Sequence, residues 1–169
     1  MFDAQPRLAG ELIELRPLVA GDFDALGRAA SDPLIWDQHP VRRHEPDVFR
    51  AFFDEQLASG GALVVVARRT GAVIGTSRYH GYETGESEVE IGWTFLARSH
   101  WGGAVNGELK RLMLEHAFRY VDRVVFIVHA ANVRSRRAVE KLGATQVGDR
   151  LDASGRLCHA YVLRSPNAG

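Results

Sequence analysis

Two adjacent glycines, Gly102 and Gly103, stand directly before a stretch with helical periodicity in the segment HWGGAVNGELKRLM. The first backbone N–H groups of a helix lack partners within the helix and carry a partial positive charge. Glycine lets a ligand approach such a backbone closely, and no Ser, Thr or Asp caps this helix start. The segment therefore suits a phosphate or pyrophosphate. The alternative is that the glycines only make a tight turn between a strand and a helix.

Two common phosphate-binding motifs are excluded. The P-loop pattern Gly-x4-Gly-Lys-Ser/Thr does not occur in the sequence. A dinucleotide-binding fold would place the glycines after the first strand of a parallel sheet. Here they follow the fourth predicted strand, and three hairpin-like strands precede them.

The elements around the glycines are predicted from apolar periodicity. Strands are expected at 11–18, 62–69, 72–82, 88–96, 123–130, 144–152 and 156–164. Helices are expected at 21–30, 47–58, 105–121 and 133–142. The order β-α-α-β-β-β-α-β-α-β-β predicts an α/β protein with a mixed sheet and helices on its faces, in one domain spanning residues 1–169.

Composition narrows the class of protein. The chain has 169 residues with 21 basic and 21 acidic side chains, so its formal net charge is zero. A protein without net positive charge has no overall electrostatic attraction to nucleic acid or to an anionic membrane. It has neither an apolar run of the ~20 residues that a membrane helix needs nor a secretory signal, so we expect a cytoplasmic protein. Cys158 is the one cysteine and is expected to be a buried small hydrophobe. The seven histidines show no metal-binding spacing, so we expect no metal.

Two blocks of sequence together resemble the GNAT acetyltransferase superfamily. In the first, SHWGGAVN stands where that family carries Arg/Gln-x-x-Gly-x-Gly/Ala between its fourth strand and a long helix. Gly102 matches the first glycine and Ala104 the second small position. Trp101 replaces the usual Arg or Gln, and the pair Trp101-Gly102 is similar to the branch of ribosomal-protein N-terminal acetyltransferases. The second block, VHAANVRSRRAVEKLGATQVG, resembles the family's strand, its Asn-x-x-Ser motif and the following helix.

The resemblance implies a GNAT-like fold and acetyl-CoA as co-substrate. The expected fold is a predominantly antiparallel sheet of about seven strands, splayed between the fourth and fifth, with about four helices. The loop amides would bind the pyrophosphate, and the splayed strand would pair with the pantetheine. The implied coenzyme contacts are Phe95, Leu96, Ala97, Arg98, Trp101, Gly102, Gly103, Ala104, Val105, Asn106, Asn132, Ser135 and Arg137. For Arg98 and for Arg137 with its arginine neighbours, the alternative is a solvated surface.

Glu90 is the candidate general base. Strand alternation places Glu88, Glu90, Gly92 and Thr94 on one face and Val89, Ile91, Trp93 and Phe95 on the other. A carboxylate facing a partly desolvated cleft has a raised pKa suited to moving a proton through a water. The alternative is a structural ion pair between Glu90 and Arg78.

The acid that protonates the leaving thiolate is harder to assign. Many superfamily members carry a tyrosine where this chain has Val139. Ser135 is the nearest replacement, because a hydroxyl can donate to sulfur. The alternative is that Ser135 bonds backbone amides in the first turn of its helix.

Trp36, Tyr79 and His80, together with Glu90, are the candidates for binding the acceptor. For Trp36 the alternative is packing. The implied reaction is direct transfer of the acetyl group of acetyl-CoA to a primary amine, either a protein N-terminus or a small molecule, in a ternary complex. The alternative is a non-catalytic acyl-CoA sensor or scaffold, and a weaker one is action on aminoacyl-tRNA. Nucleic acid and membrane are not expected partners, and a homodimer is expected because dimers are common for this fold.

Overall fold

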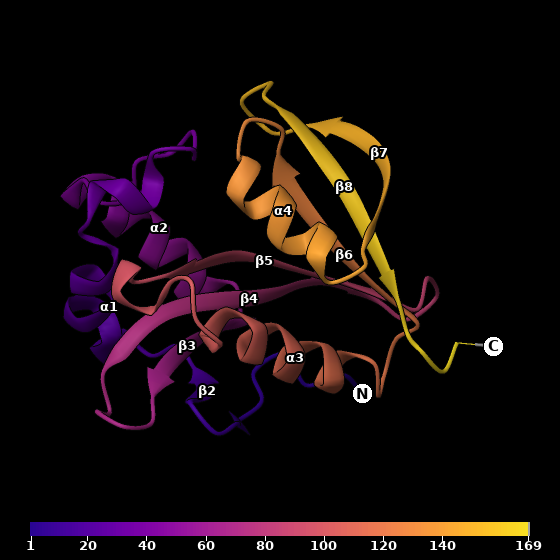
Figure 1. Ribbon diagram of the computed structural model, residues 1–169, viewed down its shortest axis with the longest axis horizontal. Coiled ribbons are helices and arrows are strands. Elements are labelled where there is room, and N and C mark those ends of the chain that lie inside the picture. The colour runs from indigo at the N-terminus through magenta and orange to yellow at the C-terminus, as the bar shows by residue number, and fades with distance from the viewer. Residues whose placement is uncertain (169) are drawn as a thin grey trace.

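The computed structural model describes residues 1–168 as one eight-stranded sheet with four α-helices (Figure 1). The strands are β1 (Leu8–Ala9), β2 (Ile13–Pro17), β3 (Ala62–Ala67), β4 (Val73–Glu83), β5 (Glu88–Leu96), β6 (Arg123–His129), β7 (Thr145–Leu151) and β8 (Leu157–Arg164). The helices are α1 (Phe23–Ala30), α2 (Pro46–Ala58), α3 (Val105–Ala117) and α4 (Val133–Lys141). The predicted mixed fold is confirmed, and the short β1 is the strand that sequence periodicity missed.

The sheet opens between β5 and β6. Its order is β1-β2-β3-β4-β5-β6-β8-β7, and every neighbouring pair is antiparallel except β5 and β6. These two parallel strands pair only from Glu88–Arg123 to Glu90–Val125, and then diverge toward their carboxyl ends (Figure 1). The predicted splay is therefore present, between the strands that sequence analysis counted as the fourth and fifth.

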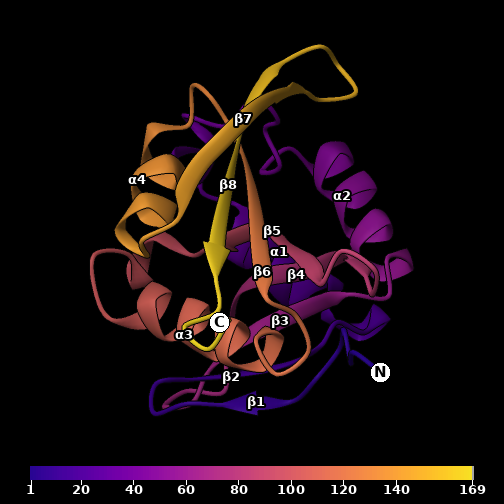
Figure 2. The ribbon, with the colours of Figure 1, turned by 90° about the vertical axis from the view of Figure 1, so that its right-hand side faces the viewer.

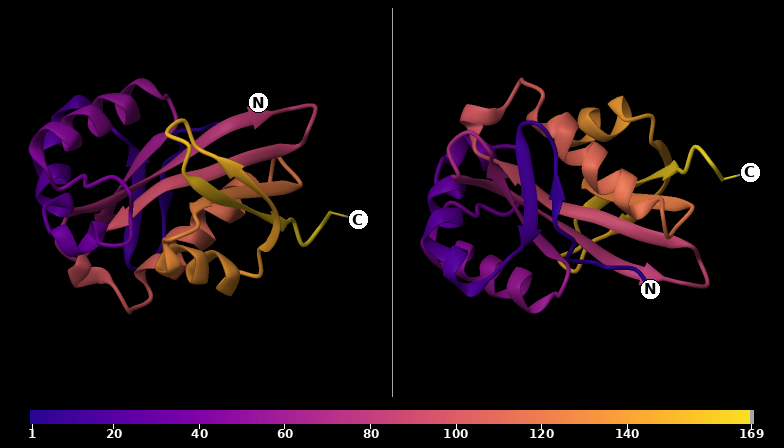
Figure 3. Two further views of the ribbon diagram at one scale, coloured as in Figure 1. Left: turned by 90° about the horizontal axis from the view of Figure 1, so that it is seen from above. Right: turned by 90° about the horizontal axis from the view of Figure 1, so that it is seen from below.

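The helices divide between the two faces of the sheet. Leu109 and Met113 of α3 and Val139 of α4 belong to one core cluster, whereas Leu26 of α1 and Phe53 of α2 belong to another. Figure 2 shows α3 and α4 on one side of the sheet and α2 on the other. Figure 3 shows α1 and α2 together at the end of the molecule opposite the end of β8. The opening between β5 and β6 is thus approached from two differently built sides.

A bulge in β5 changes which side chains face each side. Phe95 pairs with Thr76 and Gly92 with Arg78, so β5 has one extra residue here, and Trp93 has a φ of 53°. The extra residue shifts the alternation by one position. The predicted faces are therefore wrong beyond Gly92, because Ile91 packs under α3 whereas Phe95 packs with α1 and α2.

A largely covered carboxylate fixes the orientation of α3. The Glu108 oxygens accept hydrogen bonds from the backbone N–H groups of Glu11, Leu12 and Ile13 at 2.8–2.9 Å. These contacts join the first turn of α3 to the start of β2. The helix begins at Val105 as predicted, and it ends at Ala117 rather than at Val121.

Candidate functional site: a cleft through the sheet

A cavity of about 610 Å³ occupies the opening between β5 and β6. On the α3/α4 side its walls include Trp101, Gly102 and Asn106 before and within α3, and Asn132 and Ser135 at α4. On the α1/α2 side they include Trp36, His39, Arg43 and Glu90. The cavity therefore connects the start of α3 with a carboxylate at the bottom of the splay.

The start of α3 presents uncapped backbone amides. Its N-cap residue, Ala104, has no side chain that can accept a hydrogen bond, and the N–H groups of Val105, Asn106 and Gly107 precede the first intrahelical donor. Gly102 has a φ of 70°, which glycine adopts without strain. A Cβ at Gly103 would meet no atom within 4 Å, so this position opens to free space. The observed geometry fits the predicted anion site.

In contrast, the backbone N–H groups at the start of α4 already donate to acceptors within the protein. Asn132 caps it, its Oδ1 accepting from the N–H of Ser135 at 3.2 Å, and Gln38 Oε1 accepts from the N–H of Arg134 at 3.0 Å. Ser135 takes part in this cap through its backbone N–H, and the residue lines the cavity. Of the two helix starts at the cavity, α3 is therefore the one with amides left for a ligand.

The predicted coenzyme contacts fall into two groups. Those that line the cavity are Phe95, Leu96, Trp101, Gly102, Asn106, Asn132 and Ser135. Those outside its lining are Ala97, Arg98, Gly103, Ala104, Val105 and Arg137. Arg98 pairs with Asp32, and Arg137 is exposed on α4, so neither side chain forms the wall. On the α3/α4 side the wall contains Arg134, whose guanidinium lies 4.3 Å from the centroid of the Trp101 ring and pairs with Asp37.

Glu90 lines the cavity at the last position where β5 pairs with β6. Burial raises the pKa of its carboxyl, and the positive charges of Arg150 and Arg78 oppose that rise. Arg78 instead forms an ion pair with Glu55 at 3.2 Å and lies 4.0 Å from the centroid of the Trp93 ring. In residues 1–168 Glu90 forms no ion pair, so the alternative of a structural pair with Arg78 is not what the structure adopts.

Of the residues predicted to bind the acceptor, some line the cavity and others lie outside it. Trp36 lines the cavity, and it is also packed, with its Nε1 donating to the carbonyl of Ala30 at 2.9 Å. Tyr79 was placed on the cleft wall by the prediction, which is wrong: it is 2% exposed in the core under α3, and its hydroxyl donates to the Met113 carbonyl. His80 is also outside the cavity lining, exposed and edge-on to Trp93.

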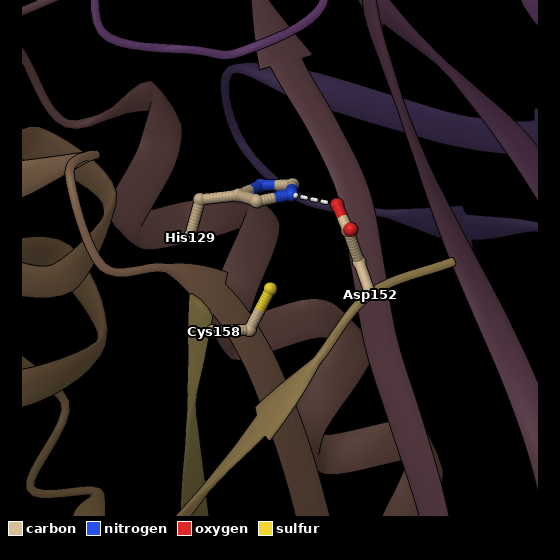
Figure 4. Close-up of side chains that lie close together, drawn as sticks. All are labelled: His129, Asp152 and Cys158. Atoms are coloured by element: carbon tan, nitrogen blue, oxygen red, sulfur yellow. Dashed lines mark hydrogen bonds and ion pairs between the residues drawn. The ribbon is translucent and has the colours of Figure 1, made fainter. Parts of the chain in front are cut away.

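A cluster that the sequence did not predict also lines the cavity, and Figure 4 shows its three side chains. His129 Nε2 lies 2.9 Å from Asp152 Oδ2. An imidazole nitrogen of His129, a carboxylate oxygen of Asp152 and Cys158 Sγ all lie within 4.8 Å of one another. Asp152 Oδ1 accepts from the N–H groups of Ser154 and Arg156, which holds the β7–β8 turn. Strand register brings the cluster together, because His129 pairs with Cys158 across β6 and β8. Sequence spacing carries no signal for such a contact.

Lys110 is a second cavity residue that sequence analysis did not single out. It is 8% exposed, and its Nζ donates to Thr94 Oγ1 at 3.0 Å. Burial lowers the pKa of its ammonium group to about 8. From sequence, a lysine beside the apolar stripe of an amphipathic helix is predicted to be a surface residue. The burial of Lys110 depends on the opening of the neighbouring sheet, which the sequence pattern of α3 does not show.

The sequence matches the family described as acetyltransferase (GNAT) domain over residues 13–145. The chain belongs to the GNAT acetyltransferase family. Membership supports acyl transfer from acetyl-CoA, and it agrees with the cleft and with the uncapped α3. No curated protein matches the chain. No helix in residues 1–168 of this GNAT domain is long and apolar enough to cross a membrane.

Solved structures share the GNAT fold along nearly the whole chain. A GCN5-related N-acetyltransferase from Brucella melitensis has a TM-score of 0.84 at 19% identity, covering 95% of this chain and 79% of its own. An acetyltransferase from Agrobacterium tumefaciens str. C58 has a TM-score of 0.73 at 24% identity, covering 95% of each chain. Mycobacterium smegmatis RimJ, solved in complex with CoA-disulfide, has a TM-score of 0.75 at 18% identity, covering 99% and 92%. These similarities show the fold.

Proposed function

We propose that this GNAT domain transfers the acetyl group of acetyl-CoA directly to a primary amine in a ternary complex. The observation that carries the proposal is the single cavity that joins the uncapped start of α3 to the carboxylate of Glu90. A donor held from one side of the sheet and an acceptor held from the other can react across the opening. No enzyme nucleophile is then needed, because acetyl-CoA supplies an already activated acyl group.

On the coenzyme side, the residues present suit a pyrophosphate followed by a pantetheine arm. The free N–H groups at the start of α3 can bind an anion, and Arg134 and Asn106 line the same cavity. Beyond Glu90 the edge of β5 is released from β6, so its backbone groups are free to pair with the amides of a pantetheine. Asn132 and Ser135 line the same side at α4.

On the acceptor side, Glu90 is the proposed base. An alkylammonium must lose a proton before its nitrogen can attack a thioester, and a carboxylate with a raised pKa removes that proton through a water. Asp152 adds a second carboxylate, and Trp36 and Phe95 supply apolar wall. Two carboxylates and an aromatic wall fit a cationic amine, and the guanidinium of Arg43 lines the same side. We also keep as predictions the homodimer and the cytoplasmic location.

The test is a screen for release of free thiol from acetyl-CoA with a panel of amines. The panel contains peptides with free N-termini, the same peptides with blocked N-termini, and small primary amines. We expect thiol release together with a mass increase of one acetyl group on one class of free amine. Binding of acetyl-CoA without any acetylated product would contradict the proposal and favour the sensor alternative.

A further inference from the structure

A buried lysine lies between the splayed strands on the α3/α4 side. Lys110 Nζ donates to Thr94 Oγ1 of β5 at 3.0 Å and lies 5.5 Å from the centroid of the Phe126 ring of β6. The residue is 8% exposed and lines the cavity. Its ammonium group therefore stands in the opening through which a pantetheine arm would have to pass.

The charge of Lys110 is not neutralised by the protein. Within residues 1–168, no carboxylate forms an ion pair with it, and desolvation is what lowers the pKa of its ammonium group to about 8. A buried unpaired ammonium is costly. An ammonium has three N–H donors, and the hydroxyl of Thr94 accepts one of them. The remaining donors can serve a group that enters the cavity.

The choice of lysine at this position is unusual for this chain. The sequence has only two lysines, Lys110 and Lys141, against 19 arginines. Arginine keeps its proton in proteins, whereas a buried lysine can release one. The chain thus places one of its two lysines in the cavity, while arginine supplies nearly all its other positive charges.

The opposite wall of the opening offers no such donor. Val139, which stands where many superfamily members carry an acidic tyrosine, is 4% exposed and lines the same cavity. Its side chain has no proton to give. Ser135 lies one turn earlier on α4, and a hydroxyl is a far weaker acid than an ammonium group.

We propose that the Lys110 ammonium group is the catalytic acid that protonates the sulfur of coenzyme A as the acetyl group leaves. This inference rests on the proposed function. The amine nitrogen forms a bond to the carbonyl carbon, and the carbon–sulfur bond breaks with its electron pair going to sulfur. Lys110 passes a proton to that sulfur and becomes a neutral amine. Water returns a proton to Lys110. Glu90 passes to water, one after the other, the two protons that the acceptor ammonium loses, the first before its nitrogen attacks and the second as the amide forms.

The acidity of Lys110 suits this task. The thiol of cysteine has a pKa of about 8.5, and other alkyl thiols are weaker acids. An ammonium with a pKa of about 8 therefore transfers its proton to a thiolate without an energetic cost. An ordinary lysine, with a pKa of about 10.4, would be a poorer acid for this step. Before the proton moves, the positive charge also stabilises the negative charge developing on sulfur.

The test compares Lys110→Met with Lys141→Met, the same change at the exposed lysine on α4. Coenzyme A is titrated into each protein, and the ultraviolet absorbance of the thiolate is measured, with desulfo-coenzyme A as the blank. We expect a larger thiolate fraction on the wild type and on Lys141→Met than on free coenzyme A. We expect Lys110→Met to lose that increase while calorimetry shows that it still binds acetyl-CoA. Thiol release with the amine found by the screen should fall about 100-fold in Lys110→Met alone.

Lys110→Arg keeps the positive charge but does not release a proton. It provides a second variant in case Lys110→Met does not fold. We expect it to retain the thiolate signal and to lose turnover. An unchanged thiolate signal and unchanged turnover in Lys110→Met would overturn the proposal, as would an acetyl group found by mass spectrometry on Lys110 as a reaction intermediate. Failure of the wild type to bind acetyl-CoA would instead refute the proposed function itself, so the two failures are distinguishable.

Discussion

At the scale of single residues, the site depends on where charge is left uncompensated. Glu90 and Lys110 both line the cavity, and in residues 1–168 neither forms an ion pair. Sequence reasoning could place Glu90, because a carboxylate within an apolar strand is conspicuous. It could not place Lys110, because its burial depends on the separation of β5 from β6. The prediction for Tyr79 was wrong because the alternation of side chains along a strand does not show which of its two faces lines a cleft.

Glu90→Gln tests the proposed base. Burial raises the pKa of this carboxyl, and a base must be deprotonated, so the wild-type rate should rise with pH through a pKa above the ordinary value of about 4.3. The charges around Glu90 are those of Arg150, Arg78 and Glu88. We expect Glu90→Gln to lower kcat at least about 100-fold, to leave acetyl-CoA affinity unchanged and to remove the acidic limb of the pH–rate profile. A full rate in this variant would refute the role.

At the scale of elements, most boundaries followed from sequence. β5 was predicted at 88–96 and is found there, and α3 begins at Val105 after the glycines. The bulge at Trp93 was not predictable, because it inserts one residue into an otherwise regular alternation. That single insertion turns Thr94 toward Lys110 and Phe95 toward Trp36. The local irregularity therefore decides which side chains the two sides of the cleft receive.

The cap of α4 gives a prediction at this scale. Asn132→Ala should lower the free energy of unfolding by about 1 kcal/mol, because the N–H of Ser135 loses its acceptor. Asn132→Ser should restore most of that stability, since serine is an equally good cap. Urea unfolding of the three proteins measures this. If Asn132 also contacts the coenzyme, both variants will bind acetyl-CoA more weakly. If Asn132→Ser binds as tightly as the wild type, the residue is a cap and nothing more.

At the scale of the whole molecule, the fold builds one opening with two sides. Helices α3 and α4 cover the side with the uncapped amides, and α1 and α2 cover the side that Glu90 faces (Figure 2). Sequence order and the two GNAT-like blocks were enough to predict the splayed sheet and its four flanking helices, but not which helices cover which face. The His129–Asp152–Cys158 cluster was beyond them, because its members come from β6, a turn and β8 and meet only through strand register.

The most direct test of the account is calorimetric titration of the wild type and Gly103→Glu with acetyl-CoA. A side chain at Gly103 meets open space, so the variant should fold, yet its carboxylate would stand beside the amides proposed for the pyrophosphate. Gly85→Glu, the same change in the open β4–β5 turn, is the control. We predict tight binding by the wild type and by Gly85→Glu, and binding at least about tenfold weaker by Gly103→Glu. Equal affinities in all three proteins, or no binding by the wild type, would contradict the account.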